Sequence, residues 1–365
     1  MSHSAINEAK ISEAGNRYGP TAARRVTAAG LRPATRTIDI HAHVLIPEAT
    51  EIAAKHVDMM KIPLARHADE ATRKLNMIQD RDRGVAIADF RDRLAVLDAQ
   101  RIDMQIVSPP PPQCYYHVPL EVAIKATQVL NDGLSAWVTQ DPTRFAALGS
   151  VPLQDGAAAV AELDRLMRLP GMKGVQILTS VNGQELSHPD LDSFWARVEA
   201  LGAVVLLHPN GFTEGRRFED HYFNNVIGNP LETTLALHRL IFDGVLERYP
   251  DLKIVAVHGG GYLPAYSGRI DHAWGARIDA RAGLPRPPTE YLRRVYVDSV
   301  VFTPHQLEYL ARVQGVDRVV MGSDYPYDMA DYDPVEHVMG VPSFSDEDRA
   351  SIAGLNAAAL FGLDG

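Results

Sequence analysis

The chain has 365 residues, of which 46% are apolar and 22% are charged, so it can bury a large core and is not a disordered chain. Its formal net charge of −10 argues against a surface for nucleic acid or anionic membrane, and no apolar run approaches the length of a membrane span. The single cysteine, Cys114, excludes an internal disulfide and is typical of a reducing compartment, so we expect a cytoplasmic protein.

Residues 1–35 are the first segment that the sequence sets apart. They are rich in Ala and Arg and lack the apolar stretch of a secretory signal. We expect a solvated N-terminal extension there and one folded domain over 36–365.

Eight short segments along the rest of the chain have the composition of buried strands. Most are rich in β-branched residues, and Gly, Pro, Asp or Ser bounds most of them. Several are nearly continuous apolar runs, as expected for strands that are buried on both faces. The predicted strands are 37–43, 104–109, 145–152, 174–179, 203–209, 253–259, 295–300 and 318–324.

Segments with helical spacing of apolar residues alternate with these strands. Clear examples are 90–97, 120–138 and 157–167, and the segment 230–249 has proline at its start and just beyond its end. Eight strand–helix alternations predict an α/β fold, a single (β/α)8 TIM barrel. The alternative is a doubly wound open sheet, which is disfavoured because no glycine-rich phosphate loop follows the first strand.

Two stretches exceed what a bare barrel needs. Residues 51–85 follow the first strand and carry two histidines, three methionines and scattered charges, which predicts a helical insert over the barrel mouth. The proline-rich loop 109–115 follows the second strand. Active sites of this barrel lie among the loops after the strands, so both stretches are candidate pocket walls, and surface loops are the alternative.

The most informative motif is His41-Ala42-His43 at the end of the first strand. Side chains two residues apart on a strand point to the same face, so these imidazoles can bind one divalent metal ion. The alternative is a strand that carries two histidines by chance. Asp39 shares that face but lies further back, where it would be a weak ligand or a support beneath the metal.

Three more chemically useful side chains stand where predicted strands end. His208 ends the fifth strand, His258 the sixth and Asp324 the eighth. Singly, each has an ordinary explanation as a hydrogen-bonded structural residue or a turn former. Together with His41 and His43 they fall on the catalytic face of a barrel, which favours one common site. Imidazole and carboxylate donors without a usable cysteine suit zinc, manganese or iron.

Arg269 and Arg277 follow His258 on a segment with helical character. Eight residues on a helix make a little over two turns, so both guanidinium groups could face one side. There they could bind a substrate carboxylate, and solvated or ion-paired surface arginines are the alternative.

This ordered set of motifs resembles the amidohydrolase superfamily, and within it the branch of 2-amino-3-carboxymuconate-6-semialdehyde decarboxylase and γ-resorcylate decarboxylase. The resemblance covers about residues 37–362, and the stretch 286–302 is similar to the muconate-semialdehyde decarboxylases in particular. The motifs that carry it are Asp39-Ile-His41-Ala-His43, Leu207-His208-Pro209, Val257-His258-Gly-Gly-Gly261 and Gly322-Ser-Asp324-Tyr-Pro326.

The resemblance implies a metal site and an acid/base residue. It implies one divalent ion, usually zinc with manganese or iron as alternatives, and it makes His258 the acid/base group. It also implies that Arg277 binds the substrate carboxylate and that Arg269 does so across a dimer interface. The implied metal ligands are His41, His43, His208 and Asp324.

Two departures from the family pattern bear on the chemistry. The fourth predicted strand ends Gln176-Ile-Leu-Thr179, without the lysine that bridges two metals in hydrolytic members, which favours a single metal ion. Asn210 stands where the muconate decarboxylase has an aromatic residue, so that family's other substrate contacts do not transfer.

We therefore expect a metal-dependent carboxy-lyase of small aromatic or muconate-type carboxylates, without an organic cofactor, in aromatic catabolism. His258 would supply the proton that replaces CO₂, and Asp324 would orient water as well as ligate. The alternatives are a hydrolase of an amide, lactone or C–C bond that uses metal-bound hydroxide, and a barrel that binds metal without turnover. The expected partners are a small carboxylate and further copies of the chain, as a homodimer or higher homo-oligomer, but neither nucleic acid nor membrane.

Overall fold

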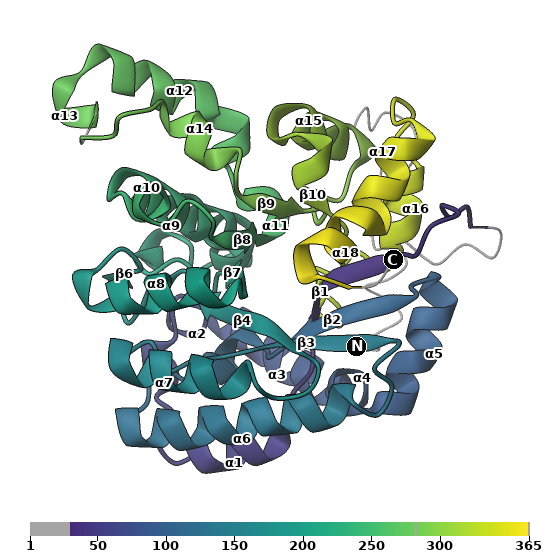
Figure 1. The fold of residues 1–365 in the computed structure, drawn as a ribbon. Helices are drawn as coiled ribbons and strands as arrows, with labels where there is room; N and C mark the ends of the chain where they lie inside the picture. The colour runs from purple at the N-terminus through teal and green to yellow at the C-terminus, as the bar shows by residue number, and fades with distance from the viewer. Residues whose placement is uncertain (1–29, 282, 364–365) are drawn as a thin grey trace.

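The structure is a computed structural model that describes residues 30–281 and 283–363. Most of the predicted extension over 1–35 lies outside the described residues, so its solvated character and the boundary at residue 36 stay predictions. Figure 1 shows parallel strands curled into a barrel with helices around them. Within the described ranges, no helix is long and apolar enough to cross a membrane.

All eight predicted strands are present and form one parallel sheet, so the predicted (β/α)8 barrel is confirmed. The sheet nearly closes because the last strand returns to the first. The N–H of Ile40 donates to the carbonyl of Met321 over 3.0 Å, and the N–H of His43 donates to the carbonyl of Tyr325 over 2.8 Å. In sheet order the strands are β1 (Ile38–His43), β2 (Met104–Ser108), β3 (Phe145–Gly149), β4 (Met172–Leu178), β7 (Val204–His208), β8 (Lys253–Ala256), β9 (Tyr296–Asp298) and β10 (Val319–Val320).

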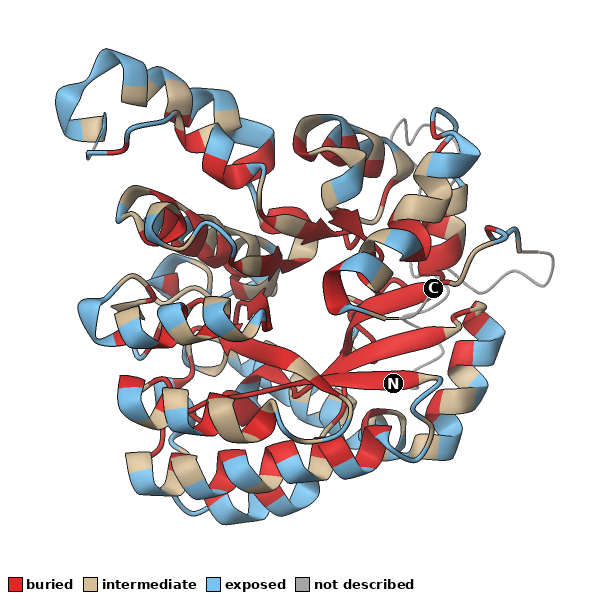
Figure 2. Ribbon diagram, viewed as in Figure 1, coloured by how far each residue is buried: buried red, intermediate tan, exposed pale blue. Residues whose placement is uncertain are grey.

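The strands are buried on both faces, as their apolar runs predicted. Every residue of β1, β2, β3 and β7 is buried, because helices cover the outside of the barrel and side chains fill its inside. Figure 2 shows the buried strands at the centre and the exposed outer faces of the helices. The helices from residue 90 onward include α5 (Phe90–Gln100), α6 (Leu120–Val138), α7 (Gly156–Leu166), α8 (Asp192–Leu201), α9 (Asn229–Phe242), α10 (Val245–Arg248), α12 (Leu263–Ala276), α13 (Ile278–Arg281), α14 (Pro288–Leu292), α15 (Pro304–Gln314), α16 (Pro334–Met339), α17 (Asp346–Ala350) and α18 (Asn356–Phe361).

The segment after β1 is helical, as the sequence predicted. It is fixed to the loop after β7, because the N–H of Leu64 donates to the carbonyl of Asn210 over 3.0 Å. The side chain of Asn224 also donates to the carbonyl of Pro63 over 2.9 Å. The insert therefore has a defined position over one side of the barrel mouth. Its elements are α1 (Pro47–Ala53), η2 (Met59–Lys61), α2 (Pro63–Arg66), α3 (Glu70–Asp82) and α4 (Gly84–Ala88).

Two predicted elements differ from the structure, one by a break within it and one at its end. The helix predicted over 230–249 is two helices, α9 and α10, because Gly244 adopts φ 78° and breaks the helical path between them. The strand predicted over 253–259 ends at Ala256, because His258 and Gly259 adopt left-handed φ values of 54° and 63°. That turn forms the short helix α11 (Val257–Gly260), which carries His258.

Candidate active site

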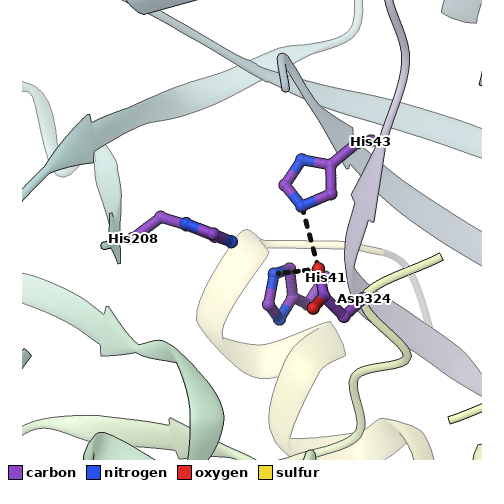
Figure 3. Close-up of side chains that lie close together, drawn as sticks. All are labelled: His41, His43, His208 and Asp324. Atoms are coloured by element: carbon purple, nitrogen blue, oxygen red, sulfur yellow. Dashed lines mark hydrogen bonds and ion pairs between the residues drawn. The ribbon is translucent and has the colours of Figure 1, made fainter. Parts of the chain in front are cut away.

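Four of the predicted site residues meet at the C-terminal mouth of the barrel. His41 and His43 come from the end of β1, His208 from the end of β7 and Asp324 from the segment after β10. All four are buried, and one donor atom from each lies within 4.8 Å of the others. Figure 3 shows the imidazoles and the carboxylate converging on one point. Nε2 of His43 lies 3.1 Å and Nε2 of His41 lies 3.3 Å from Oδ1 of Asp324.

The outer nitrogens of the three imidazoles already have partners. Nδ1 of His43 contacts the carbonyl of Pro109 at 3.0 Å, and Nδ1 of His208 contacts the carbonyl of Pro209 at 2.6 Å. Nδ1 of His41 contacts the Asp298 carboxylate at 2.7 Å. These contacts leave Nε2 of each ring as the nitrogen that faces the centre of the cluster.

The Nε2 nitrogens, which face the centre of the cluster, are suited to bind a metal ion. Nε2 of His208 is buried without a hydrogen-bond partner among the described residues, and Nε2 of His41 makes no hydrogen bond there beyond its 3.3 Å ion-pair contact with Asp324. Leaving a buried polar atom unpaired is costly, and binding of a cation removes that cost. Three imidazole nitrogens and one carboxylate oxygen are a donor set that divalent transition metals accept. The residues present therefore fit a single divalent ion.

The ionisable side chains of the cluster shift the pKa values of one another. Burial by itself raises the pKa of Asp324, but the neighbouring imidazoles of His41, His258 and His43 outweigh burial and hold that pKa well below its usual range. Burial alone would lower the pKa of His41, yet the Asp324 and Asp298 carboxylates raise it to about 10. Burial and the adjacent imidazoles hold the pKa of His208 well below its usual value. Asp324 is thus an anion at neutral pH, as a metal ligand must be.

Asp298 is a site residue that the analysis of strand ends did not identify. Asp298 is the last residue of β9. Its Oδ2 accepts the 2.7 Å hydrogen bond from Nδ1 of His41. Its Oδ1 accepts the backbone N–H of Gly259 at 2.8 Å. A carboxylate behind a ligating histidine fixes the tautomer and the ring orientation. A signal was present in the sequence, because Asp298 lies near the end of the seventh predicted strand, 295–300, as His208 and His258 lie near the ends of theirs.

Asp39 acts as a support of the barrel mouth. Its carboxylate accepts hydrogen bonds from the hydroxyl of Ser323 at 2.6 Å and from the amide of Gln105 at 2.7 Å. The backbone N–H groups of His41 and Ser323 donate to it at 3.0 Å each. With these four bonds the side chain ties β1 to the segment that carries Asp324, and among the described residues the metal cluster does not include it.

His258, for which the family resemblance implies an acid/base role, lies beside the cluster. Its Nε2 is 3.5 Å from Oδ2 of Asp324. The left-handed backbone at His258 and Gly259 sets this position, and a Cβ on Gly259 would lie 2.5 Å from Val301. Backbone strain of this kind is concentrated at functional sites. Nδ1 of His258 is buried without a hydrogen-bond partner in the described part of the chain.

A cavity of about 370 Å³ opens directly above these residues. His208, His258 and Asp324 form its floor. The helical insert and the proline loop form much of its wall, so both predicted pocket walls are present. Most of these wall residues are apolar, which suits a flat organic substrate. They include Met59, Met60, Ile62, Leu64, Met77, Pro111 and Pro112.

The insert also places a guanidinium group in this cavity, which the sequence did not indicate. Arg83 follows the last residue of α3, and its side chain is only 11% exposed. The guanidinium lies 4.6 Å from the ring centre of Tyr327 and 3.1 Å from Asp80. Tyr222 and Asp328 line the same wall, with 3.5 Å between the Tyr222 hydroxyl and an Asp328 carboxylate oxygen. The cavity lining thus includes two guanidinium groups, those of Arg73 and Arg83, and the carboxylates of Asp80 and Asp328, within a mostly apolar surface.

The two arginines singled out from the sequence lie elsewhere in the chain. Arg269 is exposed on α12, and Arg277 caps the C-terminal end of that helix with φ −134°. Arg277 is 68% exposed and forms an ion pair with Asp279 at 2.6 Å. Figure 1 shows α12 and α13 projecting from the barrel. Neither arginine lines the cavity of this chain, and Arg277 lies just beyond the last residue of the helix that carries Arg269.

Comparisons with known proteins agree with this geometry along almost the whole chain. The chain is 32% identical over 332 residues to 2-amino-3-carboxymuconate-6-semialdehyde decarboxylase of Dictyostelium discoideum, which covers 90% of this chain and 92% of the relative. It is 29% identical over 346 residues to γ-resorcylate decarboxylase of Rhodococcus jostii, covering 90% and 98%. The crystal structure of 5-carboxyvanillate decarboxylase from Sphingomonas paucimobilis superposes with a TM-score of 0.79 at 27% identity, covering 91% of this chain and all of that one. The amidohydrolase family model matches residues 38–363, a range that holds every residue of the cluster, and the chain therefore belongs to the amidohydrolase family.

Proposed function

We propose that this protein is a metal-dependent decarboxylase of a small aromatic or muconate-type carboxylate. The observation that carries the proposal is the joint geometry of the four buried donor residues and His258 beneath one mostly apolar cavity. The full-length similarity to enzymes named as decarboxylases of such carboxylates supports the same reaction class.

Hydrolysis of an amide, lactone or C–C bond remains the competing reaction. The relatives that match 90% of the chain are decarboxylases, which favours loss of CO₂. In β4 the side chain of Gln176 donates to the carbonyl of Pro109 at 2.9 Å and accepts from the hydroxyl of Ser108 at 2.8 Å. No lysine follows it on the strand, so a lysine-bridged pair of metal ions has no support in this chain.

We assign the metal to His41, His43, His208 and Asp324, and we propose zinc, because imidazole-rich sets with an open position suit it. A divalent ion bound there supplies a Lewis acid for an oxygen of the substrate. Analysis of the metal content of the purified protein tests both the stoichiometry of one ion per chain and the identity of the metal.

In the proposed mechanism, the chain's own residues position the substrate and move one proton. The apolar wall holds the flat carbon skeleton and excludes water, and the guanidinium of Arg83 attracts the carboxylate. When the C–C bond breaks, CO₂ leaves and the bonding electron pair stays on the substrate carbon. His258 then donates a proton from Nε2 to that carbon, while Asp324 orients the imidazole from 3.5 Å away.

A homodimer is the proposed assembly. Three apolar side chains, Tyr262, Tyr266 and Ile278, are exposed on and around the projecting α12 and α13, and Ile278 is 92% exposed. We call α12 and α13 the projecting arm. A second copy of the chain that covered this arm would bury these side chains. It would also bring Arg269 of one copy toward the site of the other, as the family resemblance implies. Light scattering after size exclusion tests this assembly.

The single buried Cys114 is in keeping with the proposed cytoplasmic location.

The reaction class can be tested with isotopes. A decarboxylase must release CO₂ and place one solvent-derived hydrogen on the carbon that lost it, whereas a hydrolase must place oxygen from water in its product. Turnover of hydroxybenzoates, aminobenzoates and muconate semialdehydes in deuterated and in ¹⁸O-labelled water distinguishes the two. Deuterium without ¹⁸O in the product is the expected result, and stable ¹⁸O without CO₂ would establish the hydrolase instead.

A further inference from the structure

A second cavity of about 650 Å³ lies beside the catalytic one on the same face of the barrel. We call it the side cavity. It is lined by η2 and α2, the segment 116–120, the hairpin of β5 (Ser180–Val181) and β6 (Gln184–Glu185) that follows β4, and the loop after β7. Met60, Ile62 and Asn210 line both cavities and form the wall between them. Neither the four metal-cluster residues nor His258 lines the side cavity, so the proposed reaction does not account for it.

The lining of the side cavity is positively charged. It contains Lys61 at the end of η2 and Arg66 at the end of α2, and it contains no aspartate or glutamate. In the described part of the chain, neither of these two side chains has a hydrogen bond or an ion pair. Two unpaired cations around one hollow create a potential that attracts an anion. An arginine whose guanidinium N–H groups have no partner can bind two oxygens of a carboxylate or phosphate group at once.

A third basic group faces the same hollow. Nε2 of His117 is buried and has no hydrogen-bond partner among the described residues. Burial and the nearby Lys61 ammonium lower the pKa of His117, while Asp58 opposes that shift. Asp58 caps η2 through the N–H of Met60, so part of its hydrogen-bonding capacity is used. A neutral imidazole whose nitrogen lacks a partner can complete the coordination of an anionic group.

The remaining lining determines what kind of anion would fit. Val118, Pro119, Leu120 and Leu178 give one side of the cavity an apolar surface. Hydroxyl and amide groups line much of the rest, and two of these lining residues, Thr213 and Ser180, donate hydrogen bonds to the buried carboxylate of Glu232. This combination suits an organic anion with an apolar body better than an inorganic ion.

We propose that the side cavity is a second binding site, which takes a small organic anion with an apolar body. Lys61 and Arg66 hold its carboxylate or phosphate group, and His117 contributes the third polar contact. The wall shared through Met60 and Ile62 places this ligand next to the substrate without displacing it.

Calorimetric titration of the full-length protein with phthalate and with phenyl phosphate tests the proposal, because these probes present the two anionic groups on the same apolar ring. We expect at least one of them to bind to the wild-type protein, and the stronger one identifies the preferred group. The Lys61→Ala/Arg66→Ala variant should weaken that binding by about tenfold or more, which is the effect of losing charged hydrogen bonds.

The matched control is Lys55→Ala/Lys74→Ala, which removes the same charge from two exposed positions of the same insert outside both cavities. It should leave the affinity within about twofold, as expected for screened charges at a distance. An equal loss in both double variants would show nonspecific attraction and overturn the proposal. The proposal would also be overturned if neither probe bound to the wild-type protein.

Histidine-selective NMR supplies a local readout. The His117 resonance, assigned by its loss in His117→Gln, should shift when the probe binds, and binding that leaves this resonance unmoved would place the ligand elsewhere and refute the assignment. Arg66→Gln replaces the double variant if the latter melts early. Neither measurement requires turnover, so their outcome is independent of the reaction proposed for the catalytic cavity.

Discussion

Nδ1 of His41 donates a hydrogen bond of 2.7 Å to Oδ2 of Asp298, and both side chains are completely buried. This bond fixes Nε2 of His41 as the nitrogen that faces the metal cluster. The other oxygen of Asp298 holds the N–H of Gly259, the residue after His258. One carboxylate therefore positions both a candidate metal ligand and the candidate acid/base residue.

Replacement of Asp298 by Asn should weaken metal binding by about 10- to 100-fold, because the His41 imidazole loses its anionic partner and its fixed orientation. Competition with a chromophoric chelator measures the affinity. Asp317→Asn is the control, since that exposed carboxylate forms an ion pair with the adjacent Arg318 on the surface. Unchanged affinity in Asp298→Asn would show that the hydrogen bond does not tune the site.

His41→Ala should remove most of the metal and most of the activity while the barrel remains folded. The side chain is one of four donors, and the loss of one ligand from such a set leaves weak binding. Metal analysis after dialysis and far-ultraviolet circular dichroism give the two readouts. Full metal occupancy in a His41→Ala/His43→Ala double variant would refute the proposed ligands.

His258→Asn should keep the metal and the fold, yet lower kcat by roughly 10²- to 10⁴-fold, the range for loss of a general acid or base. His56→Asn is the matched control, because His56 is exposed and lines neither cavity. Turnover of the His258 variant at nearly the wild-type rate would mean that another group moves the proton.

Arg83→Ala should raise KM more than kcat falls, because a carboxylate that is bound equally in the ground state and the transition state contributes mainly to binding. Arg277→Ala provides the comparison. In the single chain its guanidinium pairs with Asp279 on the projecting arm, so a smaller effect on KM is expected. A larger rise in Arg277→Ala would transfer the substrate-binding role to Arg277, as the family resemblance implies.

The affinity for a divalent ion should fall as the pH is lowered from 8 to 6. Burial opposes the charged form of His41, but the Asp324 and Asp298 carboxylates hold its pKa at about 10, so the metal-free ring carries a proton over this range. His43 and His208 have lowered pKa values and contribute no further proton at pH 8. Displacement of one proton weakens binding by about tenfold for each pH unit. Chelator competition at pH 6, 7 and 8 would contradict this if the affinity were constant.

The barrel and the core of the site could be predicted from the sequence because each of their signals is local. Strands that are buried on both faces appear as short apolar runs, and parallel strands bring their C-terminal ends to one face. His41, His43, His208, His258 and Asp324 all stand at such ends, so their convergence follows from the alternation of strands and helices. The structure brings these five side chains together as predicted.

The remaining features depend on contacts between distant segments, which local patterns do not encode. Asp298 meets a histidine 257 positions away in the sequence, and Arg83 enters the cavity only because the insert packs against the loop after β7. The helix that carries Arg269 ends at Ala276, so helical periodicity does not extend to Arg277. Periodicity predicts which residues share a face of one element, whereas the packing of loops against one another decides which side chains share a cavity.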